Sequence, residues 1–255
     1  MNSSDLFRLE GKTALVTGSA QGLGREIAVG LAQSGCSLVL ADLADTEETA
    51  KEVSETGSRS ISVKVDVSNE ADIEKMVERT TAEYKTVDIL VNNAGISQLS
   101  FTATEELPAG EWDKILAVNL RGTFLCCKHI GKQMIRSGGG SIINIASTAG
   151  ITGVVRAPAY CASKAGVILL TKSLALEWAR YQIRVNAIAP HYLETELTKG
   201  LRASEKVYDG LVKQIPLRRF AKPAEMVGTV LLLASPASSY MTGTVITVDG
   251  GYLSQ

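Results

Sequence analysis

Residues 9–42 read LEGKTALVTGSAQGLGREIAVGLAQSGCSLVLAD, and this stretch decides the fold. An apolar run over 12–17, rich in strand-forming residues, leads into a turn punctuated by glycines at 18, 22 and 24. Apolar residues then recur at helical spacing, and a second apolar run over 37–41 ends in Asp42. The order of strand, glycine-rich turn, helix and strand predicts a βαβ unit.

The glycine-rich turn predicts a site for a dinucleotide. Glycine lets the backbone approach a pyrophosphate, and the amino end of the next helix offers N–H groups and a positive dipole. Asp42 lies where an acid accepts hydrogen bonds from an adenosine ribose. The spacing is G-x-x-x-G-x-G rather than G-x-G-x-x-G, so the prediction depends on the elements around the glycines.

Strands and helices alternate along the rest of the chain. We expect strands over 14–17, 37–41, 60–65, 88–91, 141–145, 184–188 and 244–248, and helices over 22–34, 46–56, 70–84, 111–137, 159–181 and 223–234. Short apolar runs without clean alternation are typical of strands covered on both faces. The pattern predicts an α/β fold: a Rossmann-type doubly wound sheet of seven parallel strands with helices on both faces, in one domain over 1–255.

One segment, at about 191–222, interrupts this alternation. Its mixed charged and apolar residues are spaced as in one or two short amphipathic helices. Long excursions inside compact domains are usually lids or binding loops, so we expect a substrate lid here.

Composition excludes several classes of protein. The formal net charge of the 255 residues is −1 and no stretch concentrates Lys or Arg, so nucleic acid is not expected as a partner. The amino end lacks an apolar signal core, and the longest apolar stretch, 227–234, is too short to cross a bilayer. Four cysteines without C-x-x-C spacing and two histidines predict free thiols, no metal centre and a cytoplasmic location: Cys36, Cys126, Cys127, Cys161, His129 and His191.

A second stretch, IASTAGITGVVRAPAYCASKAG at 145–166, suggests chemistry. Tyr160 and Lys164 are four residues apart, which places them on one face of a helix. An ammonium beside a phenol should lower the tyrosine pKa from about 10 and make it a proton donor or acceptor near neutral pH. Ser147, just after a strand, can bind a substrate oxygen. A tyrosine and a lysine four residues apart also occur on helices by chance, so a catalytic interpretation of Tyr160 and Lys164 depends on the rest of the chain.

Together these residues resemble the short-chain dehydrogenase/reductase family. The matches follow the family's order along nearly the whole chain: TGSAQGLG at 17–24, Asp66-Val67, NNAG at 92–95, Asn119, Ser147, YCASK at 160–164, VNAIAP at 185–190 and VDGG at 248–251. The resemblance implies hydride transfer between a nicotinamide cofactor and a carbonyl or alcohol carbon. It is far more specific for the family than for the substrate.

The resemblance implies four catalytic roles. Tyr160 is the acid or base, Lys164 lowers its pKa and binds the nicotinamide ribose, and Ser147 orients the substrate oxygen. Asn119 holds a water that links Lys164 to solvent. The alternative for Asn119 is an asparagine inside a helix, bonded to a neighbouring carbonyl.

The resemblance also implies a set of cofactor contacts. Asp66 accepts from the adenine amino group with Val67 against the ring, and Thr195 contacts the carboxamide. The NNAG segment passes the adenosine ribose or, alternatively, mainly stabilises the sheet. The expected contacts are Gly18, Ser19, Gln21, Gly22, Leu23, Gly24, Asp42, Asp66, Val67, Asn93, Ala94, Gly95, Tyr160, Lys164, Pro190 and Thr195.

NAD is the expected cofactor. The Asp42 carboxylate repels a 2′-phosphate and can accept hydrogen bonds from two ribose hydroxyls. The residues at 19–21 include no Arg or Lys that would pair with that phosphate. This counts against a biosynthetic 3-oxoacyl-(acyl-carrier-protein) reductase, which remains an alternative. A dinucleotide-binding regulator or scaffold without catalysis is an alternative of another class.

Two departures from the family pattern concern the substrate. His191 follows Pro190 where the family usually has glycine, either as a specificity element or as a tolerated turn residue. Arg156 could clamp a carboxylate or simply face solvent. With Ser147, these are the candidate substrate residues. The stretch APHYLETELTKGL at 189–201 resembles gluconate 5-dehydrogenases and polyol dehydrogenases, so we expect a small polar substrate such as a sugar acid or polyol.

The two longest expected helices predict self-association. Helices over 111–137 and 159–181 carry more apolar side chains than one sheet face can cover. Related proteins pair through these helices, so we expect a homotetramer, with a homodimer as the alternative. The side chains concerned are Leu116, Phe124, Leu125, Leu169, Leu170, Leu174 and Trp178.

Overall fold

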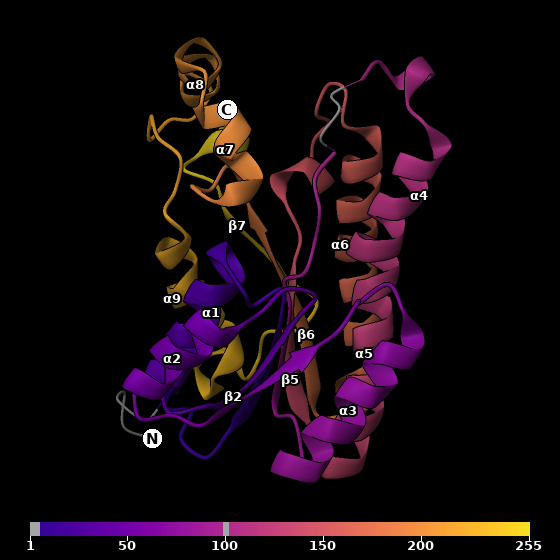
Figure 1. Cartoon of the computed structure of the whole chain (residues 1–255), viewed down its shortest axis with the longest axis vertical. Coiled ribbons are helices and arrows are strands. Elements are labelled where there is room, and N and C mark those ends of the chain that lie inside the picture. The colour runs from indigo at the N-terminus through magenta and orange to yellow at the C-terminus, as the bar shows by residue number, and fades with distance from the viewer. Residues whose placement is uncertain (1–5, 99–101) are drawn as a thin grey trace.

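The computed structural model describes residues 6–98 and 102–255 and contains one seven-stranded parallel sheet (Figure 1). The strand order is β3-β2-β1-β4-β5-β6-β7. The order reverses between β1 and β4, and in sheets of this kind ligands bind at that point, beyond the carboxyl ends of the strands. The strands are β1 Thr13–Thr17, β2 Ser37–Asp42, β3 Ser60–Lys64, β4 Ile89–Asn92, β5 Gly140–Ile145, β6 Ile183–Pro190 and β7 Val245–Val248.

Helices cover both faces of the sheet (Figure 1). One face carries α1 (Gly22–Gln33), α2 (Glu47–Glu55) and α9 (Val227–Ala234). The other carries α3 (Glu70–Tyr84), α4 (Ala109–Leu116), α5 (Thr123–Ser137) and α6 (Pro158–Trp178). The predicted doubly wound α/β fold is confirmed.

Each face of the sheet has its own apolar core, which explains the continuous apolar strands. Alternate residues of one strand point to opposite faces. Val39 belongs to the core on the side of α3 and α5, whereas its neighbours Leu38 and Leu40 belong to the core on the side of α1 and α2, and all three are fully buried. A strand buried on both sides has no polar face, so its sequence shows no alternation.

The expected helix over 111–137 is interrupted. A π-turn over Ala117–Gly122 separates α4 from α5. At its end Gly122 lies against Val67, and a Cβ at this glycine would be 2.9 Å from the valine Cγ2. Single π-turns inside α-helices frequently mark functional sites. Two other expected helices are also shorter: a 3₁₀ turn over Pro223–Met226 precedes α9, and another over Ala179–Tyr181 follows α6.

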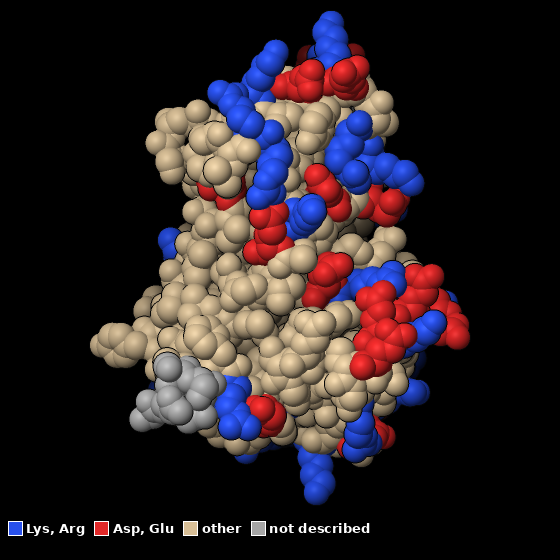
Figure 2. Space-filling model, turned by 90° about the vertical axis from the view of Figure 1, so that its left-hand side faces the viewer, with Lys and Arg blue, Asp and Glu red and all other residues tan. Residues whose placement is uncertain are grey.

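The segment at 191–222 folds as predicted, with two short helices. A 3₁₀ turn over Glu196–Thr198 leads into α7 (Lys199–Arg202) and α8 (Glu205–Val212). A parallel bridge between Leu193 and Ala221 closes the segment at its base. Charged side chains of both signs lie over this end of the molecule (Figure 2).

One helix is more apolar than the sequence analysis recognised. The stretch 158–181, which comprises α6 and its final turn, is long and apolar enough to cross a bilayer by length and composition alone. The expectation that 227–234 is the longest apolar stretch is therefore wrong. In the fold, α6 packs along β6 and buries Lys164, Val167 and Thr171, as the core helix of a sheet does.

Candidate active site

The glycine-rich turn after β1 is packed too tightly for a side chain at Gly18 or Gly24. A Cβ at Gly24 would lie 1.9 Å from the Gly18 carbonyl oxygen and 2.5 Å from Asn93 Nδ2. A Cβ at Gly18, whose φ is +67°, would lie 2.8 Å from Ala94 Cα. The turn and the NNAG segment are therefore in direct backbone contact. Gln21 caps α1 in an extended conformation, with Gly22 and Leu23 in its first turn.

Thr17 joins this turn to the NNAG segment, a role that the sequence analysis missed. Its hydroxyl accepts from the backbone N–H groups of Asn93 and Ala94, both at 3.1 Å. In return, Asn93 Nδ2 donates to the carbonyl oxygens of Thr17 at 3.0 Å and Gly18 at 2.9 Å. The segment thus holds the glycine turn in place, whether or not it also touches a ligand.

Two acidic residues predicted to bind adenosine lie at the carboxyl ends of neighbouring strands. The Asp42 carboxylate accepts from the Ala20 N–H at 2.8 Å and from the Ala44 N–H at 2.9 Å. Asp66 accepts from the backbone and hydroxyl of Ser68, at 2.9 and 2.7 Å. Each carboxylate has four lone-pair sites, so both keep acceptor capacity for a ligand. Ser19 is buried beside the end of β2, and Val67 is 8% exposed.

Ser147, Tyr160 and Lys164 come together at the carboxyl end of β5. Ser147 Oγ accepts from the Ala149 N–H at 3.1 Å and is hydrogen-bonded to Tyr160. Lys164 Nζ lies 5.8 Å from the centroid of the Tyr160 ring and donates to the Ile145 carbonyl at 2.8 Å.

The expected direction of the Tyr160 pKa shift is wrong for this structure. Burial raises the pKa of the phenol, and the hydrogen bond with Ser147 opposes that rise only in part. Burial also lowers the pKa of the Lys164 ammonium to about 8. Removal of both groups from water disfavours both charged forms and outweighs the attraction between them. Tyr160 is thus a protonated phenol at neutral pH.

Asn119 lies in the π-turn and ties three elements together. Its Oδ1 accepts from the Ile96 N–H at 2.8 Å, and its Nδ2 donates to the Ile96 carbonyl at 2.9 Å and to Ser163 Oγ at 3.1 Å. Ser163, also unassigned from the sequence, donates to the Tyr160 carbonyl at 2.8 Å. The Asn119 side chain is therefore bonded to a neighbouring carbonyl, as in the alternative given above. The water that would link Lys164 to solvent stays a prediction.

Gly95 lies close to Asn119 and Lys164. A Cβ at this position would lie 3.2 Å from Asn119 Oδ1 and 3.6 Å from Lys164 Nζ. The NNAG segment, the π-turn and α6 therefore meet at one point, next to the glycine turn that Asn93 holds.

The first turn of the 191–222 segment lies next to the glycine turn. A Cβ at Gly22 would be 3.5 Å from Thr195 Cγ2. Arg202 of α7 donates to the Thr195 carbonyl at 2.9 Å and so helps to fix this turn. Pro190 ends β6 just before it, paired with Val248 of β7.

The two departures from the family pattern have different environments. A hydrogen bond of 2.8 Å joins His191 Nδ1 to the hydroxyl of Thr148, the residue after Ser147. The imidazole stacks on Tyr252 with a centroid distance of 3.9 Å, and burial lowers its pKa to about 4. Arg156 is exposed and has a φ of +60°, and its carbonyl accepts from Gln98 Nε2 at 3.0 Å.

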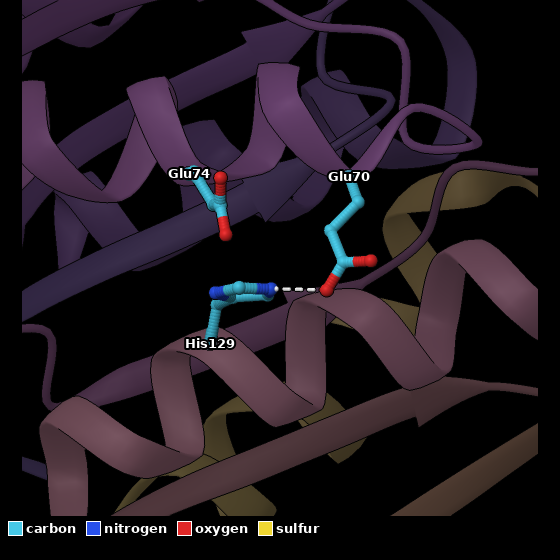
Figure 3. Close-up of side chains that lie close together, drawn as sticks. All are labelled: Glu70, Glu74 and His129. Atoms are coloured by element: carbon cyan, nitrogen blue, oxygen red, sulfur yellow. Dashed lines mark hydrogen bonds and ion pairs between the residues drawn. The ribbon is translucent and has the colours of Figure 1, made fainter.

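One group of side chains in the described part of the chain, between α3 and α5, has the spacing of a metal site. Glu70 and Glu74 of α3 face His129 of α5 (Figure 3). Lys128 and His129 both donate to the same oxygen of Glu70, at 2.6 and 2.9 Å, and lower the pKa of that carboxyl to about 2. The group is thus a cationic–anionic cluster that joins two helices.

The chain is similar to known proteins along nearly its whole length. A family model described as enoyl-(acyl carrier protein) reductase matches residues 18–253. The chain is 41% identical over 250 residues to a 2-dehydro-3-deoxy-D-gluconate 5-dehydrogenase of Dickeya dadantii, covering 98% of each chain. It is 40% identical over 247 residues to an NAD-dependent glycerol dehydrogenase of Listeria innocua, covering 96% of this chain and 95% of the relative.

A solved structure is similar over the whole length. A gluconate 5-dehydrogenase from Burkholderia cenocepacia, in complex with NADP and tartrate, superposes with a TM-score of 0.94 at 35% identity, covering 100% of both chains.

Proposed function

This chain belongs to the short-chain dehydrogenase/reductase family, and on that premise we propose that it interconverts a secondary alcohol and a ketone by hydride transfer. The observation that carries the proposal is the meeting of Ser147, Tyr160 and Lys164 beside the glycine turn. A regulator without catalysis would not need this buried polar arrangement.

Each side chain of the site has its own role in the proposed reaction. The nicotinamide supplies or accepts the hydride when bound. Tyr160 is a protonated phenol and gives its proton to the carbonyl oxygen during reduction. Ser147, already hydrogen-bonded to Tyr160, orients that oxygen. Lys164 holds the ribose, and Asn119 keeps α6 and the NNAG segment in register.

We propose NAD rather than NADP as the cofactor. The Asp42 carboxylate is fixed at the end of β2, where it would repel a 2′-phosphate. The next residue, Leu43, is 62% exposed and offers no positive charge. The glycerol dehydrogenase relative is NAD-dependent, whereas the Burkholderia structure holds NADP. The Asp42 carboxylate is the feature of this chain that supports NAD.

We propose a small polyhydroxylated alcohol, such as a polyol or sugar acid, as the substrate. The relatives named for glycerol and for 2-dehydro-3-deoxy-D-gluconate support this class. Arg156, exposed in the loop before Tyr160, is available to an anionic substrate, and His191 to a neutral one.

We further propose a cytoplasmic homotetramer. The outer faces of α5 and α6 expose Phe124, Leu169 and Leu176, of which Leu176 is 86% exposed. Large apolar side chains on adjacent helices favour association with another subunit. The four cysteines are free, which fits a reducing compartment. A monomeric mass in light scattering at micromolar concentration would contradict the assembly.

A coupled assay tests the function directly. Purified protein is incubated with glycerol, D-gluconate and propan-2-ol, each with NAD and with NADP, and the nicotinamide absorbance is followed. We expect turnover of at least one polar alcohol, with a higher kcat/KM for NAD. No turnover of any alcohol with either cofactor would contradict the proposal, and a tenfold preference for NADP would contradict the argument from Asp42.

A further inference from the structure

Two buried polar atoms next to the catalytic segment have no hydrogen-bond partner in the described structure: Gln98 Oε1 and His191 Nε2. A polar group that is buried without a partner costs free energy, so native structures rarely keep one without a reason. We propose that Gln98 and His191 form a polar subsite that binds hydroxyl groups of the substrate beyond the reacting carbon. The inference rests on the proposed function and names the residues that select its substrate class.

The orientation of Gln98 is set by its neighbour. Its side chain donates through Nε2 to the Arg156 carbonyl at 3.0 Å, and a carbonyl oxygen can only accept. The amide nitrogen must therefore face Arg156, and Oε1 must point elsewhere. Gln98 is only 1% exposed, so water does not reach this oxygen freely. Gln98 Oε1 is therefore a hydrogen-bond acceptor of fixed orientation that has no donor in the described structure.

The orientation of His191 is set from two sides. Nδ1 is joined to the Thr148 hydroxyl at 2.8 Å, and the ring stacks on Tyr252 at an interplanar angle of 14°. A threonine hydroxyl can donate or accept, so Nε2 is a donor in one tautomer and an acceptor in the other. A substrate hydroxyl can pair with either form.

Both contacts are made to the segment that carries the catalytic side chains. Thr148 directly follows Ser147, and Arg156 lies four residues before Tyr160. Gln98 follows the NNAG segment, and His191 follows the last residue of β6. Gln98, in the loop after β4, and His191, after the end of β6, are thus each bonded to the 147–160 segment and each keep one unpaired atom directed away from that bond.

The remaining unpaired buried atoms of the described chain lie outside this segment. They are Tyr84 Oη, Asn92 Oδ1 and Arg202 Nε. The Asn92 amide is bonded within the core to Asn144 at 2.8 Å, and Arg202 belongs to the lid. Of the residues with an unpaired buried atom in the described structure, Gln98 and His191 are the two that are hydrogen-bonded to the 147–160 segment.

The two unpaired atoms, Gln98 Oε1 and His191 Nε2, favour substrates with hydroxyl groups over substrates with hydrocarbon substituents. Each hydroxyl offers one donor and two acceptor sites, which satisfies an amide oxygen and an imidazole nitrogen together. A purely apolar substituent would leave both atoms buried and unpaired, and sites of this kind reject analogues that lack the hydroxyl. We therefore expect a preference for polyols over simple secondary alcohols.

Glycerol and propan-2-ol give a matched test because they differ only in two terminal hydroxyls. The measurement is the ratio of kcat/KM for glycerol to that for propan-2-ol, with NAD. In wild type the ratio should be well above one. Gln98→Met and His191→Phe should each lower this ratio roughly tenfold. Both substitutions keep the size of the side chain, and His191→Phe also keeps the aromatic stacking. Gln33→Met on the exposed end of α1 and His129→Phe on α5 are the matched controls and should leave the ratio unchanged.

The outcomes separate the two proposals. Turnover of both alcohols with ratios unchanged in both variants would overturn the subsite and leave the proposed function standing. No turnover of any alcohol would overturn the proposed function and the subsite with it. Folding is checked by circular dichroism and the unfolding midpoint, and if Gln98→Met does not fold, the His191→Phe ratio alone decides.

Discussion

His191 should make the protein sensitive to mild acid. Its imidazole is held neutral in the fold, with a pKa lowered from 6.5 to about 4 by burial, although the nearby Asp249 carboxylate opposes the shift. In the unfolded chain the same imidazole takes up a proton below about pH 6.5. Between these values the unfolded state binds more protons than the folded state. The free energy of unfolding must therefore fall as the pH falls through this window.

The size of the effect follows from the two pKa values. A shift of this size is worth at most about 3 kcal/mol once both pKa values have been passed, at roughly 1.4 kcal/mol per unit. Between about pH 7.5 and about pH 5 the loss attributable to His191 is about 2 kcal/mol. This is a large share of the roughly 5–15 kcal/mol that a domain has in total.

Urea denaturation at the two pH values measures the loss, because the other titrating groups cancel when wild type and variant are compared. His191→Phe keeps an aromatic ring against Tyr252 but cannot take a proton, so it should lose about 2 kcal/mol less than wild type on acidification. Thr148→Val is the control: it removes the hydroxyl that bonds Nδ1 but keeps the imidazole, and so keeps the acid-dependent loss. Equal losses in wild type and His191→Phe would refute the argument that the ring is held neutral.

Four further changes test the site. Tyr160→Phe removes only the phenol hydroxyl, so kcat should fall roughly 10²-fold or more while cofactor binding, measured by fluorescence titration, persists; wild-type turnover would contradict the acid/base role. Asp42→Ala should lower the NAD-over-NADP ratio of kcat/KM roughly tenfold, and an unchanged ratio would count against charge selection. Gly24→Ala places a methyl 1.9 Å from a carbonyl oxygen and should cost about 1–3 kcal/mol of stability or more, whereas Gly228→Ala, with open space around it, should cost little. Arg156→Ala should raise KM for D-gluconate more than for glycerol, and equal changes would make this arginine an ordinary surface residue.

The fold could be predicted closely because each strand is a short apolar run between helices. Most expected strand and helix ends agree with the structure to within one or two residues, as for the helix over 70–84, which matches α3. The same periodicity could not show the π-turn at 117–122. One extra residue in a helical turn leaves the apolar pattern within each flanking helix intact, so only the folded backbone shows the π-turn.

The site could be predicted as a set of residues but not as a set of environments. Sequence motifs brought Ser147, Tyr160 and Lys164 together correctly, yet the sign of the tyrosine pKa shift depends on burial, which spacing does not report. Thr17 and Ser163 stand inside quoted motifs, but their bonds run to other segments. A residue's type indicates which bonds it can form, and only the fold shows which ones it has formed.

The position after Pro190 shows how one side chain can couple distant parts of this fold. The imidazole of His191 stacks on Tyr252 of the last turn and its ring centroid lies 4.3 Å from that of Tyr192, which in turn stacks on Phe220 near the end of the 191–222 segment. Its Nδ1 is hydrogen-bonded to Thr148, the residue after Ser147. A glycine here, as is usual in the family, would leave these rings without their central member. The histidine thus connects the carboxyl-terminal turn, the 191–222 segment and the turn that follows Ser147.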